Sequence, residues 1–427
     1  MPSPVTPPRG MRDILPADKA RREALLATIR DTYRRHGFDE IETPVMEDSS
    51  RLHAGLGGDN EKLAFAVMKR GLTTDELQAA ATPLELADLG LRFDLTVPLA
   101  RFYASNRAEL PSVFRAIQIA PVWRAERPQK GRYRQFVQCD IDIIGEPGVF
   151  AEIELITATV DALATLGVPG CTIRINDRRL LTSMLAALGF PAEQGEAVLI
   201  TLDKLDKIGV DGVLAELRER GMPETAVAAL AEVPALVAAK AGESATTAVT
   251  AEAIRASLPD GIDETAVSGL AEIAAAVGEG VPLAFDPFLV RGMGYYTGPI
   301  FEVAHPEFGY SLGGGGRYDG MIGRFAGTDV AACGFSLGFE RLVDLVTTGE
   351  DARGGSALIV DKDVAPADTI SLKRALVEGG ERVRVVTRAK NMRALLERLE
   401  ADGYTRFATV RAGERDAATL QWRALGE

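Results

Sequence analysis

Two runs of alternating apolar and polar residues flank a short polar turn at about residues 124–134. Ile117, Ile119 and Trp123 are apolar positions of the first run, and residues 137–143 alternate strictly in the second. A period of two is typical of a strand that turns one face toward a core. The two runs therefore predict an antiparallel hairpin.

One face of this hairpin is rich in charge. It carries Arg124, Glu126, Gln138, Asp140 and Asp142. Burying such groups without partners is strongly destabilising. We therefore expect this face to line a cavity that holds a polar, charged ligand.

The residues before the hairpin predict smaller elements. A helix is expected from about Pro16, with Gly37 as its C-terminal stop. A short strand broken by Pro44 should follow, then a strand at 64–71 and a loop that continues to Leu91 and could act as a lid. Residues 91–101 read as a strand entering a helix, in which Asp94 is a candidate for the helix cap or for the site.

After the hairpin, the pattern predicts an amphipathic helix over 146–167 and a strand over 171–177. Residues 180–280 are rich in Ala, Leu, Glu and Val at helical spacing, which indicates a helical insertion. Strands should return at 285–305. The run SLGGGGRYDG at 311–320 lacks the context of a phosphate-binding motif, and it favours a floor for a flat ligand over a flexible turn.

A glycine-bearing linker at 349–355 precedes a change of pattern. From there to Glu427, strand-like and helix-like runs alternate. Alternation of this kind predicts a small α/β domain with a partly parallel sheet. We therefore expect two domains, 1–349 and 350–427.

Composition narrows the class of protein. The chain has 427 residues, 46% of them hydrophobic and 26% charged, with no run of about 18 apolar residues and no apolar core near its start. We expect a cytoplasmic protein without a membrane segment. The net charge of -13 argues against a general nucleic-acid coat, although Arg127, Lys130, Arg132 and Arg134 form a local basic patch.

Cysteine and histidine chemistry are poorly supported. Cys139, Cys171 and Cys333 lie far apart without a CxxC spacing, so neither a disulfide framework nor a zinc site is expected. The three histidines lie outside the charged runs described above. A serine-histidine-aspartate mechanism is therefore disfavoured.

Four segments together resemble the histidyl-tRNA synthetases, a family of class II aminoacyl-tRNA synthetases. WRAERPQKGRYRQF (123–136) resembles motif 2 of the family, and GFSLGFERL (334–342) resembles motif 3. LVRGMGYYTGPIFE (289–302) resembles the histidine-specific motif, with Gly294 where an acidic residue is common. RFDLTVP (92–98) resembles the histidine-binding strand of the archaeal and eukaryotic-like branch.

The resemblance implies an α+β catalytic domain with a six-stranded antiparallel sheet flanked by helices. It also implies a helical insertion at about 180–280 and a small C-terminal α/β domain of the anticodon-binding type. In this chain the C-terminal domain is shortened, because only GERDAATLQWRALGE follows the run RFATVR. The family further implies a homodimer formed around the first helix and Pro44.

The implied function is activation of L-histidine with ATP and transfer to the histidine tRNA, with Mg²⁺ accompanying ATP and no metal held by protein ligands alone. The resemblance assigns catalysis to Arg124, Arg291 and Arg341. It assigns histidine binding to Asp94, Leu95, Thr96, Arg124, Gln138, Asp142, Arg291, Tyr295 and Tyr296. It assigns ATP binding to Arg124, Glu126, Arg132 and Arg341, and the tRNA acceptor end to Arg127 and Gln129.

Two alternatives remain open from the sequence. One is the regulatory subunit of ATP phosphoribosyltransferase, a histidine-sensing relative of the catalytic core without its C-terminal domain. The other is a synthetase paralogue that activates histidine for an acceptor other than tRNA. Positioned arginines can stabilise charge on a reacting phosphate without a covalent nucleophile, which favours an activating enzyme over the regulatory subunit.

Overall fold

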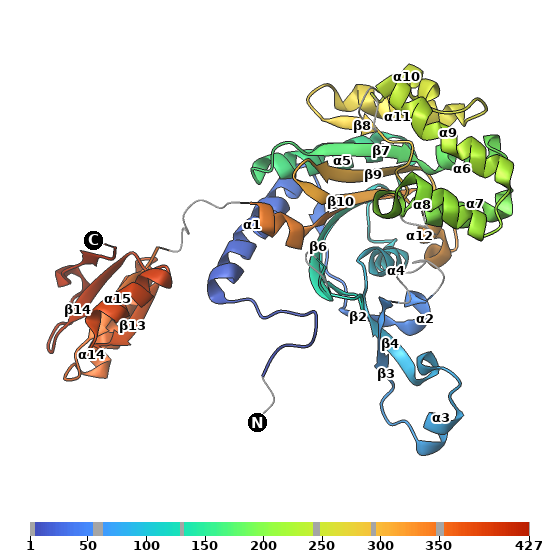
Figure 1. The fold of residues 1–427 in the computed structure, drawn as a ribbon. Helices are drawn as coiled ribbons and strands as arrows, with labels where there is room; N and C mark the ends of the chain where they lie inside the picture. Colours follow the sequence, from blue (N-terminus) through green and yellow to red (C-terminus); the bar gives the residue numbers. More distant parts are fainter. Residues whose placement is uncertain are drawn as a thin grey trace. The chain divides into compact units, whose positions relative to one another are not determined.

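The computed structural model describes residues 5–53, 63–128, 132–241, 248–291, 296–346 and 354–426. The chain divides into two compact units (Figure 1). The first comprises Met1–Arg12 and Leu26–Val346, and the second comprises Asp13–Leu25 and Thr347–Glu427. The predicted first helix is present as α1 (Pro16–Arg35), and Gly37 follows it with a positive φ of 83°.

The first unit is built on an eight-stranded sheet. In order across the sheet, the strands are β1 (Asp39–Glu40), β5 (Phe114–Trp123), β6 (Gln135–Ile144), β11 (Ala332–Gly338), β10 (Phe308–Arg317), β9 (Pro299–His305), β7 (Thr172–Asp177) and β8 (Leu283–Phe285). Each neighbouring pair among the six inner strands is antiparallel, which confirms the expected six-stranded sheet. Strands β1 and β8 widen it by parallel pairing at its two edges.

The predicted hairpin is the pair β5 and β6. Its register runs from Phe114 opposite Ile144 to Trp123 opposite Gln135. The apolar residues Ile117, Ile141 and Ile143 are fully buried. Helix α5 (Phe150–Thr165) packs on the sheet at β6 and β11, so the apolar face of the hairpin is covered and its polar face is left for the site.

Helices α4 (Thr96–Asn106) and α12 (Asp319–Ala326) pack against each other at one end of the sheet. Leu99 and Tyr103 of α4 share a core cluster with Phe114 of β5 and Ile322 of α12. A further short helix, α13 (Phe339–Leu345), continues directly from β11. These contacts fix the start of α4 and the start of α13 relative to the hairpin.

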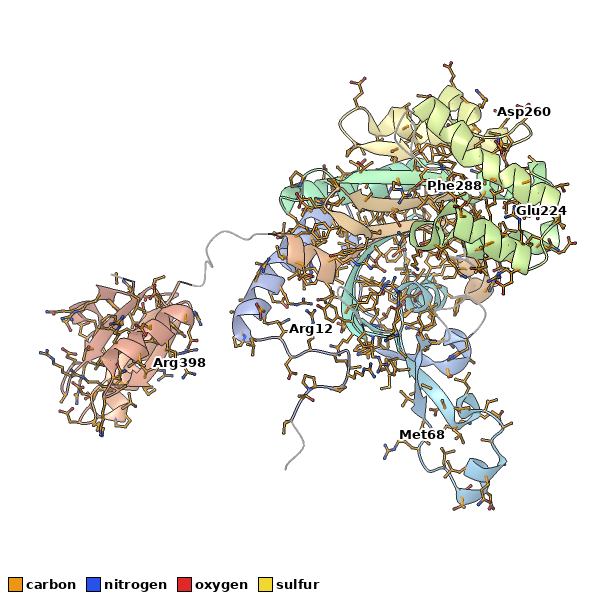
Figure 2. All side chains as sticks on the ribbon, in the orientation of Figure 1. Arg12, Met68, Glu224, Asp260, Phe288 and Arg398 are labelled. Atoms are coloured by element: carbon orange, nitrogen blue, oxygen red, sulfur yellow. The ribbon has the colours of Figure 1, made fainter. Side chains whose placement is uncertain are left out.

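A three-stranded sheet in the order β2 (Met46–Asp48), β4 (Ala87–Leu91), β3 (Phe65–Met68) projects from the first unit (Figure 1). The segment broken at Pro44 is therefore divided between two sheets. Met68, labelled in Figure 2, ends β3 and is exposed. Short helices α2 (Ser49–Leu52) and α3 (Thr74–Ala79) and a 3₁₀ turn η2 (Pro83–Leu86) accompany this sheet.

The prediction of a continuous loop up to Leu91 was wrong. The segment contains α3, η2 and β4. Helix α3 has no buried residue, so the sequence has no apolar periodicity there, and a capping box between Thr73 and Glu76 starts it instead. The predicted strand at 91–101 also ends earlier, at Leu91, and residues 92–95 connect it to α4.

The helical insertion is present between β7 and β8. Its helices are α6 (Arg178–Ala187), η3 (Ala192–Gln194), α7 (Gly195–Leu202), α8 (Leu205–Glu219), α9 (Glu224–Ala241), α10 (Ala251–Ser257) and α11 (Glu264–Val277). Helix α11 packs on α5 and β7, which ties the insertion to the sheet (Figure 1). Among the described residues, no helix is both long enough and apolar enough to cross a bilayer.

The C-terminal part of the second unit alternates strands and helices, as its sequence predicts. A four-stranded sheet has the order β13 (Val383–Thr387), β12 (Ser356–Val360), β14 (Arg406–Val410), β15 (Arg423–Ala424). Strand β12 is parallel to β13 and β14, and β15 is antiparallel. Helices α14 (Pro366–Glu378) and α15 (Met392–Ala401) and the turn η4 (Ala417–Thr419) complete it.

Candidate active site

A cavity of about 370 Å³ opens on the polar face of the central sheet. It is bounded by the start of α4, the hairpin β5–β6, strands β10 and β11 and the start of α13. The candidates from the sequence that line it are Asp94, Thr96, Arg124, Glu126, Arg132, Gln138, Asp142, Arg291, Tyr296 and Arg341. Segments more than 200 residues apart in the sequence therefore meet at one site.

Four candidates are not among the lining residues. Leu95 is fully buried, and its backbone carbonyl accepts a hydrogen bond from Gln118 Nε2 at 3.0 Å. Arg127 is exposed outside the cavity lining. Gln129 and Tyr295 lie outside the described residues.

Asp94 has both of the roles considered for it, as a cap of the helix and as a residue of the site. Its Oδ1 accepts a hydrogen bond from the backbone N–H of Val97 at 3.2 Å, at the start of α4, and its side chain also lines the cavity. Burial raises the pKa of Asp94, although the Val97 hydrogen bond and the charge of Arg124 oppose the rise. Capping and ligand contact are therefore compatible roles.

Asp142 lies on the same strand face as Gln138 and Asp140, because β6 alternates. Tyr318 Oη donates a hydrogen bond to Asp142 Oδ1 at 2.5 Å. Burial raises the pKa of Asp142 to about 7, against the lowering effect of the Tyr318 hydrogen bond. This carboxyl group can accept an N–H from a ligand when it is ionised.

Gln138 has a fixed orientation beside Asp140. Its Nε2 donates to Ser336 Oγ at 3.1 Å and to Asp140 Oδ2 at 3.3 Å. Its Oε1 is buried and has no hydrogen-bond partner among the described groups. A buried acceptor without a partner is costly, so a ligand N–H at this point would satisfy it.

Asp140 was not assigned a role from the sequence. It is 5% exposed and lines the cavity. Burial, and next the nearby Asp142 charge, raise the pKa of Asp140 well above its ordinary value. Together with Asp94 and Asp142 it makes one wall of the cavity acidic.

Arginines line the rest of the cavity. Arg124 Nε donates to the carbonyl of Phe93 at 2.9 Å. Arg291 pairs with Glu302 and donates to Ser311 Oγ at 3.1 Å. Arg341 donates to the carbonyl of Ser311, and burial lowers its pKa together with the charges of Arg132 and Arg291. These cations are held by backbone and side-chain acceptors before any ligand binds.

The glycine run is a regular part of β10 and not a flexible turn. Gly313, Gly314 and Gly315 line the cavity. A Cβ on Gly314 would lie 2.5 Å from Arg291 Cζ, and one on Gly315 would lie 1.9 Å from the carbonyl oxygen of Gly334. The absence of side chains brings the strand close to its neighbours and leaves a smooth floor, as expected for a flat ligand.

Glu340 also lines the cavity, although no local pattern in the sequence marks it as a site residue. It accepts a hydrogen bond from Arg12 Nη2 at 2.5 Å and one from the backbone N–H of Val137 at 3.2 Å. Arg12, labelled in Figure 2 ahead of α1, also lies over the ring of Tyr133, 3.5 Å from its centroid. The N-terminal segment is thereby tied to the residue next to Arg341.

An acidic wall and a set of fixed arginines suit a ligand pair of opposite charge. The carboxyl groups and Gln138 Oε1 can accept N–H groups of a cationic amine or an imidazole. The guanidinium groups can bind phosphate oxygens. The remaining residues missed from the sequence include Tyr133, Phe136, Ser311, Tyr318, Phe335 and Ser336.

Comparisons with known proteins agree with one another. A family model described as histidyl-tRNA synthetase matches residues 10–342. The histidine–tRNA ligase of Leifsonia xyli subsp. xyli (strain CTCB07) is 57% identical over 434 residues, which cover 100% of each chain. A probable histidine–tRNA ligase of Tropheryma whipplei (strain Twist) is 44% identical and covers 94% of this chain and 95% of that one.

Solved structures share the fold. A histidyl-tRNA synthetase from Nostoc sp. PCC 7120 matches with a TM-score of 0.75 at 23% identity, over 99% of this chain and 95% of that one. A structure described as an ATP phosphoribosyltransferase regulatory subunit/histidyl-tRNA synthetase from Bacillus halodurans C also has a TM-score of 0.75, at 21% identity. The latter match covers 96% of this chain and 100% of that one.

Proposed function

The chain belongs to the histidyl-tRNA synthetase family, and from this premise we infer that it activates L-histidine with ATP and transfers it to the histidine tRNA. AMP and pyrophosphate are the other products. The observation that carries this function is the 57% identity to a histidine–tRNA ligase over the whole chain. The cavity, with its acidic wall and fixed arginines, supports it independently.

We assign the acidic wall to histidine. Asp94, Thr96 and Gln138 Oε1 would take the α-ammonium group, because they offer acceptors at the start of α4 and on the hairpin. Asp142 would accept an imidazole N–H, and Tyr295 and Tyr296 would close the side-chain pocket. A pocket that hydrogen-bonds the imidazole rejects apolar analogues, since its buried acceptors would be left without partners.

We assign the arginines to ATP and to the transition state. A carboxylate oxygen of histidine attacks the α-phosphorus, a new P–O bond forms, and the bond to pyrophosphate breaks. Arg124 and Arg291 would stabilise the charge on the α-phosphate, while Arg341 would hold adenine and the γ-phosphate. Glu126 and Arg132 would contact the rest of the nucleotide. Fixed donors of this kind need no reorganisation during the reaction.

Mg²⁺ fits this donor set as a companion of ATP. It prefers oxygen ligands and is commonly held by substrate phosphates with one or two carboxylates. Glu126 and Glu340 line the cavity together with the arginines assigned to ATP, so they would hold the ion. When bound, it would neutralise phosphate charge.

In the second half-reaction, a ribose hydroxyl of the tRNA 3′ end attacks the carbonyl carbon of the adenylate, and AMP leaves. We assign Arg127 and Gln129 to the acceptor end and residues 350–427 to a further tRNA contact. We also propose a homodimer formed around α1 and Pro44. Because the acceptor is a tRNA, we place the reaction in the cytoplasm.

The two alternatives differ in what they would bind. The regulatory reading has support only from the fold of the Bacillus halodurans protein at 21% identity. The paralogue reading predicts the same histidine activation with a different acceptor.

Histidine-dependent exchange of pyrophosphate into ATP tests the first half-reaction. We expect exchange with histidine and Mg²⁺ and none with histidinol, which lacks the attacking carboxylate. A folded protein without exchange would favour the regulatory reading. Exchange without charging of the cognate histidine tRNA would favour the paralogue.

A further inference from the structure

A second cavity, of about 460 Å³, lies among α2, α4 and α12 of the first unit. Figure 1 shows these three helices close together beside the central sheet. Arg51, Arg101 and Arg324 line it, together with Ser50 and Ser105. No acidic side chain is among its lining residues in the part of the chain that the structure describes.

Arg101 is the innermost of these cations. Its side chain is 19% exposed, and its Nε donates to Oε2 of the buried Glu47 at 2.7 Å. Its Nη2 is buried and has no hydrogen-bond partner among the described groups. An ionised donor without an acceptor is costly, so a bound oxygen at this position would remove the cost.

The other two arginines reinforce the positive charge. Arg51 lies 3.7 Å from Oε1 of Glu47, the same carboxylate that Arg101 uses. Hydrogen bonds to its oxygens, and next the charge of Arg51, lower the pKa of the neighbouring Asp48. Arg324 approaches from α12. Three like charges gathered around one cavity repel one another, and this occurs in a chain whose net charge is -13. An anion in the cavity would relieve the repulsion.

We propose that this cavity binds an oxyanion of the phosphate class. Guanidinium groups match phosphate oxygens with paired N–H donors, and Ser105 adds a hydroxyl, whereas the Ser50 hydroxyl already donates to Asp48 Oδ1 at 2.6 Å. The phosphate could belong to a polynucleotide backbone or be free in solution, and the chemistry at the cavity is the same.

The location connects the cavity with the active site. Thr96, at the start of α4, lines the first cavity, and Arg101 follows five residues later on the same helix. Five residues of α-helix span about 7.5 Å along the axis. A backbone phosphate of a tRNA whose 3′ end enters the first cavity would therefore have a short path to the second. This tRNA source rests on the proposed function, whereas oxyanion binding itself does not.

The test removes the two exposed cations together, as Arg51→Gln with Arg324→Gln. Glu47 keeps its hydrogen bond from Arg101, so the fold should persist, which a melting curve checks. Arg107→Gln is the matched control, because Arg107 is exposed at the end of α4 and donates to Thr328 Oγ1 outside the cavity. Arg101→Lys keeps the charge near Glu47 but removes the paired donors.

Two measurements on the full-length protein distinguish the sources. Calorimetric titration with inorganic phosphate reports a free anion, and histidine tRNA binding over a salt series reports a backbone phosphate. If the tRNA supplies the phosphate, the double variant should bind tRNA about tenfold more weakly, with a salt slope reduced by about 1. If the anion is free, the double variant should lose phosphate binding and keep its affinity for tRNA. Arg101→Lys should lower the affinity for the same ligand, phosphate or tRNA, whose binding the double variant weakens.

The proposal is overturned if the double variant matches Arg107→Gln and wild type in both titrations. Pyrophosphate exchange is measured in parallel on every protein, and the double variant should retain it. Failure of exchange in wild type would reject the proposed function, while loss of phosphate binding in the double variant would still support the oxyanion cavity.

Discussion

At the scale of single residues, the acidic wall of the first cavity is governed by burial. Asp94, Asp140 and Asp142 are each at most 6% exposed, and burial is the largest cause of the raised pKa of each. Tyr318 opposes this effect at Asp142 alone, by donating a hydrogen bond to the carboxylate. With its pKa raised to about 7, Asp142 changes charge near neutral pH.

We predict that kcat/KM for histidine in pyrophosphate exchange rises with pH through about 7. Asp142, with its pKa at about 7, accepts an imidazole N–H more strongly when it is ionised. Free histidine also titrates near this range, with an imidazole pKa of about 6.5. In the pH profile of kcat/KM, Asp142→Asn should therefore keep the change caused by titration of free histidine and lose the change caused by titration of the enzyme. An unchanged profile in Asp142→Asn would contradict the assignment.

Tyr318→Phe tests the pKa of Asp142 by removing the hydroxyl group that donates a hydrogen bond to it. Removing the Oη–H donor removes the interaction that lowers the Asp142 pKa, so the change caused by titration of the enzyme should move to higher pH. The linked stability effect has a defined sign. Because the native pKa is raised above the ordinary 3.8, Asp142 contributes stability that is full below about pH 4 and is lost as pH rises through about 7. Unfolding free energies measured from pH 4 to 8, compared with Asp142→Asn, check this sign.

Arg291 provides a second prediction at this scale. Arg291→Ala should lower exchange by about 10²–10³-fold, the usual loss when one donor to a developing charge is removed. Its partner Glu302 still accepts from Arg174 Nη1 at 3.0 Å, so the variant should melt near the wild-type temperature. Arg115→Ala breaks a comparable ion pair, with Glu154, away from the cavity and should retain exchange. Near-normal turnover in Arg291→Ala would exclude its catalytic role.

At the scale of elements, the order of strands and helices could be predicted from the sequence because it depends on local periodicity. The hairpin, α1 and the insertion were found in this way. Contacts between distant segments could not be found: Tyr318 and Asp142 are 176 residues apart, and Glu340 is held by Arg12 from 328 residues away. Asp140 was visible as a polar position in an alternating strand, but nothing local separates a lining residue from a solvated one. The assigned roles of Tyr295 and Gln129 stay predictions.

At the scale of elements, the close packing of the β10 glycines predicts how alanine substitutions change the stability of the first unit. Gly315→Ala places a Cβ within 1.9 Å of the Gly334 carbonyl oxygen and should destabilise the first unit by about 2 kcal/mol through overpacking. Gly320→Ala is the control, because Gly320 is exposed in α12 with nothing within 4 Å of its added Cβ. The control should be neutral or more stable by about 0.5 kcal/mol, since it lowers the entropy of the unfolded chain. Denaturant unfolding measures both, and equal stability of the two variants would contradict the packing argument.

At the scale of the whole molecule, the net charge of -13 means that any tRNA contact depends on local basic groups. The second unit has such a group. Arg382 and Arg384 lie over the ring of Tyr404, at 4.3 and 4.8 Å from its centroid. Tyr404 is 5% exposed and belongs to the core, and Arg384 also pairs with Asp402, so the cluster would contact nucleic-acid phosphates through its guanidinium groups and not through the ring.

Replacing Arg382 and Arg384 together by Gln should therefore raise KM for tRNA in charging several-fold and leave histidine-dependent exchange unchanged. Arg255→Gln is the control, since Arg255 is an exposed arginine of the insertion that pairs with Glu264. Equal charging kinetics in the double variant and the control would indicate that the second unit does not contact tRNA through this cluster.

The tie between Arg12 and Glu340 has a practical consequence for handling the protein. An affinity tag or fluorophore fused ahead of residue 5 would attach to the segment that holds Glu340, one residue before Arg341. Cleavage in this segment by a contaminating protease would release the same hold. Preparations that are intact, tagged at the C-terminus and checked by mass spectrometry at the N-terminus are therefore the appropriate material for kinetics.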